Sequence, residues 1–171
     1  MSRFSIVPER SRVSIDARSS LHPIHTETDG IEGWVELEVN GGAKVNLATS
    51  HAGHLELPVE HLRSGNALED RELRRRIDAR RYPTIAGDLS VMKDTDRDGR
   101  YTVAGDVTFR GVTRRCQDEM TVELLGPKTI RLRGRSTFDV RDFGMEPPRI
   151  LLLKVEPDVV VAVEIIAEEE D

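Results

Sequence analysis

The chain is poor in cysteine, in aromatic side chains and in long apolar runs. Its 171 residues contain one cysteine, Cys116, which excludes an internal disulfide and favours a reducing compartment. No run of eighteen uncharged apolar residues occurs, and the first residues form no apolar secretion signal. These absences predict a soluble, cytoplasmic protein with no integral membrane segment.

Excess positive charge is also lacking. The formal net charge is -6 at pH 7, and a protein that neutralises phosphates needs clustered cations. The arginines between residues 71 and 81 are interleaved with Glu72 and Asp78, which is typical of a solvated helix face. We therefore expect no nucleic-acid partner.

What the sequence does contain is alternation with a period of two. Apolar and polar residues alternate in about eight segments, a pattern typical of an all-β barrel or sandwich. These segments lie at 13–17, 31–39, 55–59, 85–91, 99–113, 116–124, 130–138 and 159–165, with a weaker one at 44–49. Hairpin turns are indicated at Asp98-Gly99, Asn40-Gly41-Gly42 and Gly126-Pro127. We expect a single domain over residues 1–171.

One segment breaks this period and predicts a short helix over about 67–81. Asn66 precedes it as an N-cap, with Glu69 three residues on as in a capping box, and the Tyr82-Pro83 step should end it. Two apolar residues four apart form its narrow inward stripe: Leu73 and Ile77. Such a helix can cover the end of a barrel but not a whole sheet.

Four glycines stand on the apolar faces of four different segments: Gly33, Gly87, Gly105 and Gly134. Glycine weakens a strand, so its repeated presence needs a reason. Barrel corners and bulges are one reason, and an interior left partly empty for an apolar ligand is the other. Both can hold together.

Catalytic patterns are thin. No G-x-S-x-G, phosphate-binding glycine loop or H-E-x-x-H occurs, so we assign no catalytic residue. Two H-x-x-H pairs, His22 with His25 and His51 with His54, leave a metal or haem site as the weaker alternative, because residues three apart on a strand face opposite sides. Trp34, on a charged face, suggests a contact between subunits.

Three blocks of sequence resemble one family. GRYTVAGDVTFRGVTRR at 99–115, RRRIDARRYPTIAGDLS at 74–90 and FDVRDFGM at 138–145 occur in the order typical of the YceI-like proteins, which are polyisoprenoid-binding, lipocalin-like barrels. In the second block, Gly87 replaces the usual aromatic of the "YP-x-I-x-F" pattern, which should widen the interior.

The resemblance implies an extended antiparallel β-barrel of about eight strands with the helix near one end. It also implies a non-enzymatic binding or carrier protein that needs no cofactor, and it suggests a homodimer. The expected ligand is an isoprenoid quinone, a polyprenyl compound or a fatty-acid derivative. The implied ligand-binding residues are Gly33, Val35, Leu37, Leu73, Ile77, Ile85, Gly87, Leu89, Val103, Gly105, Val107, Phe109, Gly134, Phe138 and Phe143.

Overall fold

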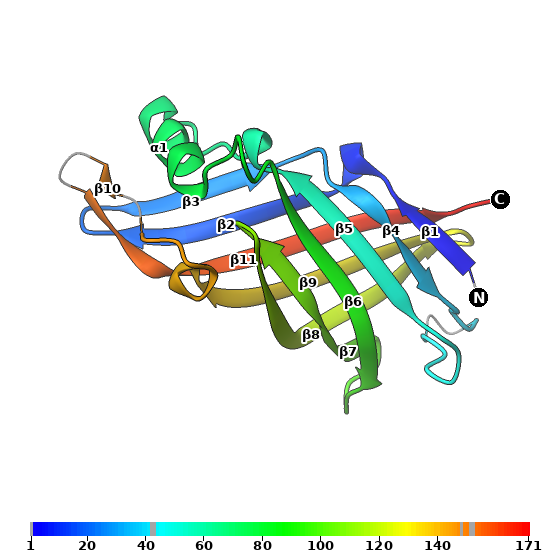
Figure 1. Ribbon diagram of the computed structural model, residues 1–171. Helices are drawn as coiled ribbons and strands as arrows, with labels where there is room; N and C mark the ends of the chain where they lie inside the picture. The colour runs from blue at the N-terminus through cyan, green and yellow to red at the C-terminus, as the bar shows by residue number, and fades with distance from the viewer. Residues whose placement is uncertain (1, 42–43, 148, 151–152) are drawn as a thin grey trace.

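Strands dominate the computed structural model, which describes residues 2–41, 44–147, 149–150 and 153–171. Eight of the strands form a closed antiparallel barrel, as expected (Figure 1). The elements in chain order are β1 (Ser2–Ile6), η1 (Pro8–Arg10), β2 (Arg12–Ser19), β3 (Pro23–Thr28), β4 (Glu32–Leu37), β5 (Ala52–Pro58), η2 (Val59–His61), α1 (Ala67–Ile77), β6 (Thr84–Asp94), β7 (Arg100–Phe109), β8 (Val112–Gly126), β9 (Thr129–Asp139), η3 (Val140–Phe143), β10 (Arg149–Ile150) and β11 (Leu153–Glu169).

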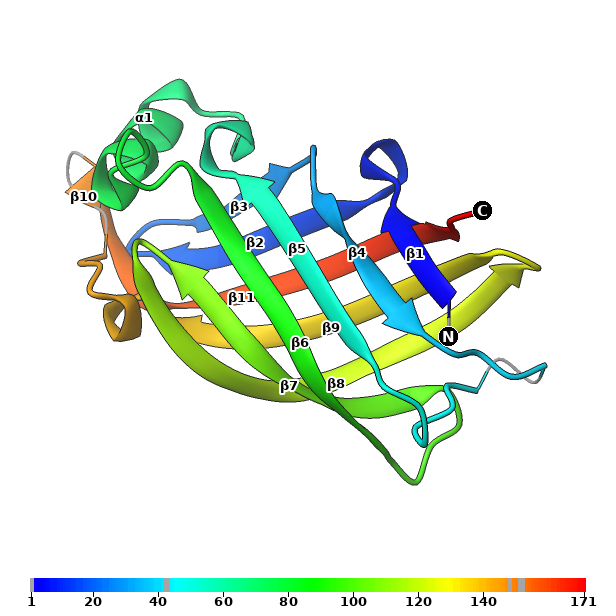
Figure 2. The same cartoon turned by 45° about the vertical axis from the view of Figure 1, so that its right-hand side comes forward.

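The barrel follows chain order around most of its circumference. Strands β4 to β9 pair consecutively, and β11 closes the ring between β9 and β1. The long strand β11 pairs with β2 along its first part and with β1 at its end. The β2–β3 hairpin therefore extends the wall at one end of the barrel, the end where α1 also lies (Figure 2).

The predicted hairpin at Asp98-Gly99 is confirmed. Strands β6 and β7 are antiparallel neighbours on either side of it, and Gly99 has a φ of +75°, which an L side chain rarely adopts. The tight connection at Gly126-Pro127 likewise joins β8 to β9. The third predicted turn includes Gly42, which lies outside the described residues.

The end of the barrel near β1 and β4 is filled by side chains. Its buried apolar residues include Phe4, Val35, Leu37, Val45, Met92, Tyr101, Val122, Ile130, Leu132 and Ile165. The Tyr101 hydroxyl, inside this core, accepts a hydrogen bond of 2.9 Å from the Val45 backbone N–H. The weak strand predicted at 44–49 is wrong, because only an isolated bridge between Val39 and Val45 forms there.

Helix α1 begins as predicted but ends earlier. The Asn66 side chain accepts hydrogen bonds from the backbone N–H groups of Leu68 and Glu69 at 3.0 and 3.3 Å. The helix ends at Ile77 and not at residue 81, because Asp78 adopts the left-handed conformation, which aspartate tolerates. Among the described residues, no helix is both long and apolar enough to cross a lipid bilayer.

Candidate functional site

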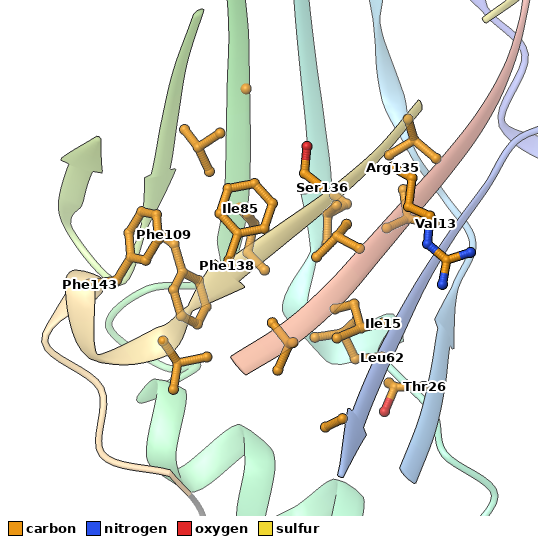
Figure 3. A pocket seen from close by; sticks show the side chains of 18 of the residues that line it. Val13, Ile15, Thr26, Leu62, Ile85, Phe109, Arg135, Ser136, Phe138 and Phe143 are labelled. Atoms are coloured by element: carbon orange, nitrogen blue, oxygen red, sulfur yellow. The ribbon is translucent and has the colours of Figure 1, made fainter. Parts of the chain in front are cut away.

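The other half of the barrel encloses a cavity of about 300 Å³. Its wall includes side chains from β2, β3, β5 to β9, β11, α1 and η3, and most of them are apolar. Figure 3 shows this arrangement, with Phe109, Phe138 and Phe143 grouped on one side and Val13 and Ile15 on the other. A cavity of this size lies at the lower end of the range found for small-molecule sites.

Helix α1 covers this half with the stripe predicted from sequence. Leu73 and Ile77 both line the cavity, and Ile77 is fully buried. The arginines on the helix instead face outward, where Arg75 and Arg76 form ion pairs with Glu72. The helix therefore closes the barrel end with an apolar inner face and a charged outer face.

The three phenylalanines form a contiguous aromatic group. The ring centroids of Phe109 and Phe143 are 5.7 Å apart and those of Phe138 and Phe143 are 6.3 Å apart. Arg114 holds the segment that carries Phe143, since its Nε donates to the Asp142 carbonyl at 2.9 Å. The group forms a continuous apolar wall on this side of the cavity.

Strands β8 and β9 diverge beside the cavity. Their register runs from Gly126–Thr129 to Met120–Gly134, and beyond this point β8 bends away from β9 (Figure 2). The Ser136 hydroxyl spans the divergence by donating to Asp118 Oδ2 at 2.6 Å, and both residues line the cavity. Cys116, also on β8, is half-buried, and burial raises the pKa of its thiol.

Ten of the fifteen residues expected to bind ligand line this cavity. They are Leu73, Ile77, Ile85, Gly87, Val103, Val107, Phe109, Gly134, Phe138 and Phe143. The other five, Gly33, Val35, Leu37, Leu89 and Gly105, do not line it. Val35 and Leu37 belong instead to the packed core near β1 and β4, because the inner face of their strand meets other side chains there.

Of the four inward glycines, two leave space in the cavity and two allow neighbouring strands to approach closely. Gly87 and Gly134 line the cavity and leave room in it. Gly33 and Gly105 do not: a Cβ atom would lie 1.9 Å from the carbonyl oxygen of His54 at Gly33, and 1.9 Å from that of Asp88 at Gly105. These two glycines therefore allow neighbouring strands to approach closely, as at a barrel corner, and the expectation that they open interior volume is wrong.

A family model for the YceI-like domain matches residues 4–167, nearly the whole chain. The chain belongs to the YceI-like family. No curated protein matches the sequence.

Solved structures with this fold are similar over most of the chain. The Burkholderia cenocepacia protein BcnA has a TM-score of 0.78 and 14% identity, covering 94% of this chain and 98% of its own. A polyisoprenoid-binding domain from Saccharophagus degradans, implicated in plant cell wall breakdown, has a TM-score of 0.78 and 12% identity, with coverage of 99% and 100%. A Campylobacter jejuni YceI protein has a TM-score of 0.67 and 14% identity, with 85% of each chain covered. At such identities, the likeness shows the fold alone.

Two histidines in this YceI-like chain, His25 and His54, are each hydrogen-bonded to acidic side chains. His25 Nδ1 lies 2.5 Å from Asp16 Oδ1 and its Nε2 lies 3.0 Å from Glu27 Oε1. These hydrogen bonds, that to Glu27 first, raise the pKa of His25. The pKa of His54 is raised in the same way, chiefly by the hydrogen bond from its Nδ1 to Asp88 at 2.6 Å.

The two remaining members of the predicted pairs are engaged elsewhere. His22 Nδ1 lies 3.0 Å from the Pro23 carbonyl, and His51 Nε2 accepts the Met92 backbone N–H at 3.0 Å. In the part of the chain that the structure describes, no three histidine, cysteine or acidic side chains are grouped so as to hold a metal ion. Trp34, expected at a subunit contact, is half-buried, with the Arg3 guanidinium 4.4 Å from its ring centroid.

Polar residues in the cavity wall were missed by the sequence interpretation. Glu69 and Asp70 are both buried, with 8% and 9% of their surface exposed, and both line the cavity with Ser64 and Thr26. The available signal was Glu69 itself, whose place three residues after Asn66 suggested a capping box. Ser64 Oγ accepts the Asn66 N–H instead, at 3.2 Å, so Glu69 is not needed there.

Proposed function

We propose that this YceI-like protein binds and carries a long apolar ligand without acting on it chemically. The ligand classes are an isoprenoid quinone, a polyprenyl compound and a fatty-acid derivative. The observation that carries the proposal is the cavity of about 300 Å³ with its mostly apolar wall. The polyisoprenoid-binding domain of the same fold in Saccharophagus degradans supports the choice of ligand class.

Burial of hydrocarbon would supply the affinity. Each CH₂ group moved out of water contributes about 0.8 kcal/mol, so two isoprene units would contribute about 8 kcal/mol before the ligand's lost freedom is subtracted. Phe109, Phe138 and Phe143 present the apolar surface that such a chain requires. No charged anchor is needed for tight binding on this account.

Solvent extraction and native mass spectrometry of the purified protein test the proposal. We expect a co-purifying apolar molecule, or a higher melting temperature when a quinone, a polyprenol or a fatty acid is added. A protein that contains no such molecule, and whose melting temperature responds to none of the three, would refute it.

A cavity-filling variant makes the test specific. Gly87→Phe places an aromatic ring in the cavity, since a Cβ at Gly87 makes only ordinary contact with Leu55 at 3.6 Å. Gly41→Phe is the matched control, because a Cβ at Gly41 has no neighbour among the described residues within 4 Å. We expect Gly87→Phe to weaken ligand binding at least about tenfold and Gly41→Phe to leave it unchanged.

We infer further that the protein acts in the cytoplasm and as a homodimer. The single cysteine suits a reducing compartment, and the half-buried Trp34 beside Arg3 offers an aromatic contact for a second copy. Light scattering of the wild type and of Trp34→Ala tests the second point, with a dimer expected only for the wild type. Two monomeric samples would contradict it.

A further inference from the structure

The side chain of Glu69 is largely buried in the wall of the mostly apolar cavity. Glu69 lies in the first turn of α1, and only 9% of its side chain is exposed. A carboxylate taken out of water loses strong hydration and needs hydrogen-bond donors or a close cation in exchange. The neighbours of Glu69 therefore show whether its carboxylate is stabilised within the protein or is free to bind a ligand.

The donors nearest to Glu69 along the chain are used elsewhere. The backbone N–H groups of Leu68 and Glu69 donate to Asn66 Oδ1. The Ser64 N–H and hydroxyl both donate to Asp70 Oδ1, at 2.8 and 2.7 Å. Asp70 is thus satisfied by the protein, and the adjacent Glu69 is not.

The nearest cationic candidate does not complete the site. His22 Nε2 lies 3.9 Å from Glu69 Oε1, which is beyond hydrogen-bond distance. The hydrogen bond that the His22 ring does make is on its other nitrogen, since Nδ1 lies 3.0 Å from the Pro23 carbonyl. Among the described residues, none donates a hydrogen bond to the Glu69 side chain. His22 is half exposed, so this carboxylate stands where the cavity approaches solvent.

We propose that the Glu69 carboxylate receives the polar head of the ligand. The site then selects a long apolar chain that ends in a hydrogen-bond donor, a hydroxyl or an amine. This inference rests on the proposed function and narrows its ligand class. A donor head would give the buried carboxylate the partner that the chain does not supply, while the apolar tail fills the cavity beyond it.

The charge of the wall argues against an anionic head. Asp70 lies next to Glu69, and Asp118 and Glu156 also line the cavity, whereas Arg135 is the one cationic residue in the described lining. A carboxylate or phosphate placed against Glu69 would meet like charge in a poorly hydrated space, where repulsion is strongest. Fatty acids and polyprenyl phosphates should therefore bind poorly.

Ligands that share one farnesyl chain and differ only in the polar head measure the effect of the head on affinity. Calorimetry at neutral pH would compare farnesol, farnesylamine, farnesoic acid and farnesyl diphosphate, with farnesene as the headless chain. The wild type should bind farnesol and farnesylamine about tenfold or more tightly than the two anions. In Glu69→Gln this preference should fall to within about threefold, whereas Glu72→Gln, on the outer face of the same helix, should keep it.

The stability of the ligand-free variants gives a second readout. Because no group in the described part of the chain donates a hydrogen bond to the Glu69 carboxylate, Glu69→Gln should melt at the same temperature as the wild type or higher. A lower melting temperature for Glu69→Gln would show that its charge supports the fold, and would overturn the inference. So would equal binding of acid and alcohol by the wild type, or an unchanged preference in Glu69→Gln. If farnesene and all four heads bind equally, the carrier function stands and this inference fails; if no probe binds, both fail.

Discussion

Adding one methyl group at Gly105 should have the opposite effect from adding one at Gly87. The two glycines lie on the neighbouring strands β7 and β6. At Gly105, a Cβ would lie 1.9 Å from the Asp88 carbonyl oxygen, 2.8 Å from its carbon and 3.1 Å from Leu89 Cα. All three atoms are backbone, so no change of rotamer relieves the overlap and the strands must separate.

The magnitude of this effect follows from the kind of atom that must move. Overpacking relieved by side chains costs about 1–3 kcal/mol, so backbone overlap in Gly105→Ala should cost at least about 3 kcal/mol. At Gly87 the new Cβ meets only Leu55 Cγ, at 3.6 Å, and Gly87→Ala should be neutral or stabilise by up to about 1 kcal/mol through the unfolded chain.

Urea unfolding and thermal unfolding, both followed by circular dichroism, measure the two variants under the same conditions. The two melting temperatures should differ by about 10 °C for a chain of this size. The reasoning fails if Gly105→Ala unfolds within about 1 kcal/mol of the wild type, or if the two variants behave alike.

Two further predictions concern the outer face and the helix. The pKa values of His25 and His54 are raised in the folded protein, so their stabilisation is complete below the ordinary histidine pKa of 6.5 and is lost as pH rises through the folded values. In urea unfolding, the double variant His25→Asn/His54→Asn should have a lower free energy of unfolding than the wild type at about pH 6, and this difference should disappear by about pH 9. A difference that grows with pH would contradict this. Asn66→Ala removes the cap of α1 and should lower the free energy of unfolding by about 1 kcal/mol; an unchanged urea midpoint would show that the cap contributes nothing.

Alternation along the strands predicted most of the fold, because it states which face of a strand is buried. It could not separate Gly87 from Gly105. Both are gaps in an inner face, and the difference between them is the distance to the backbone of the next strand, which depends on where the barrel bends. A bulge in β6 between Leu89 and Val91, opposite Gly105, lies at that bend. No pattern in the neighbouring sequence predicts the bulge.

The end of the helix and the role of Glu69 were missed for a related reason. Tyr82-Pro83 is a valid stop signal, but Asp78 ends the helix first by adopting a left-handed conformation that many residue types would resist. Glu69 fits a capping box in sequence, yet Ser64 takes that hydrogen bond from outside the four-residue pattern. In each case the sequence signal is real, but another residue, Asp78 or Ser64, performs the same role first. Which residue does so depends on three-dimensional geometry.

The barrel can keep one half open because its strands run through both halves. Strand β11 pairs with β2 beside the cavity and with β1 in the packed core, and its register with β9 is continuous from Asp158 to Glu168. The strand register is therefore fixed by side-chain packing at the end near β1 and β4, and the continuous backbone hydrogen bonds maintain the same register at the cavity end. A largely buried carboxylate and an open cavity each cost stability, and both lie in the half whose strands are held in place by packing at the other end. A binding site that is incomplete without its ligand is thus compatible with a stable fold.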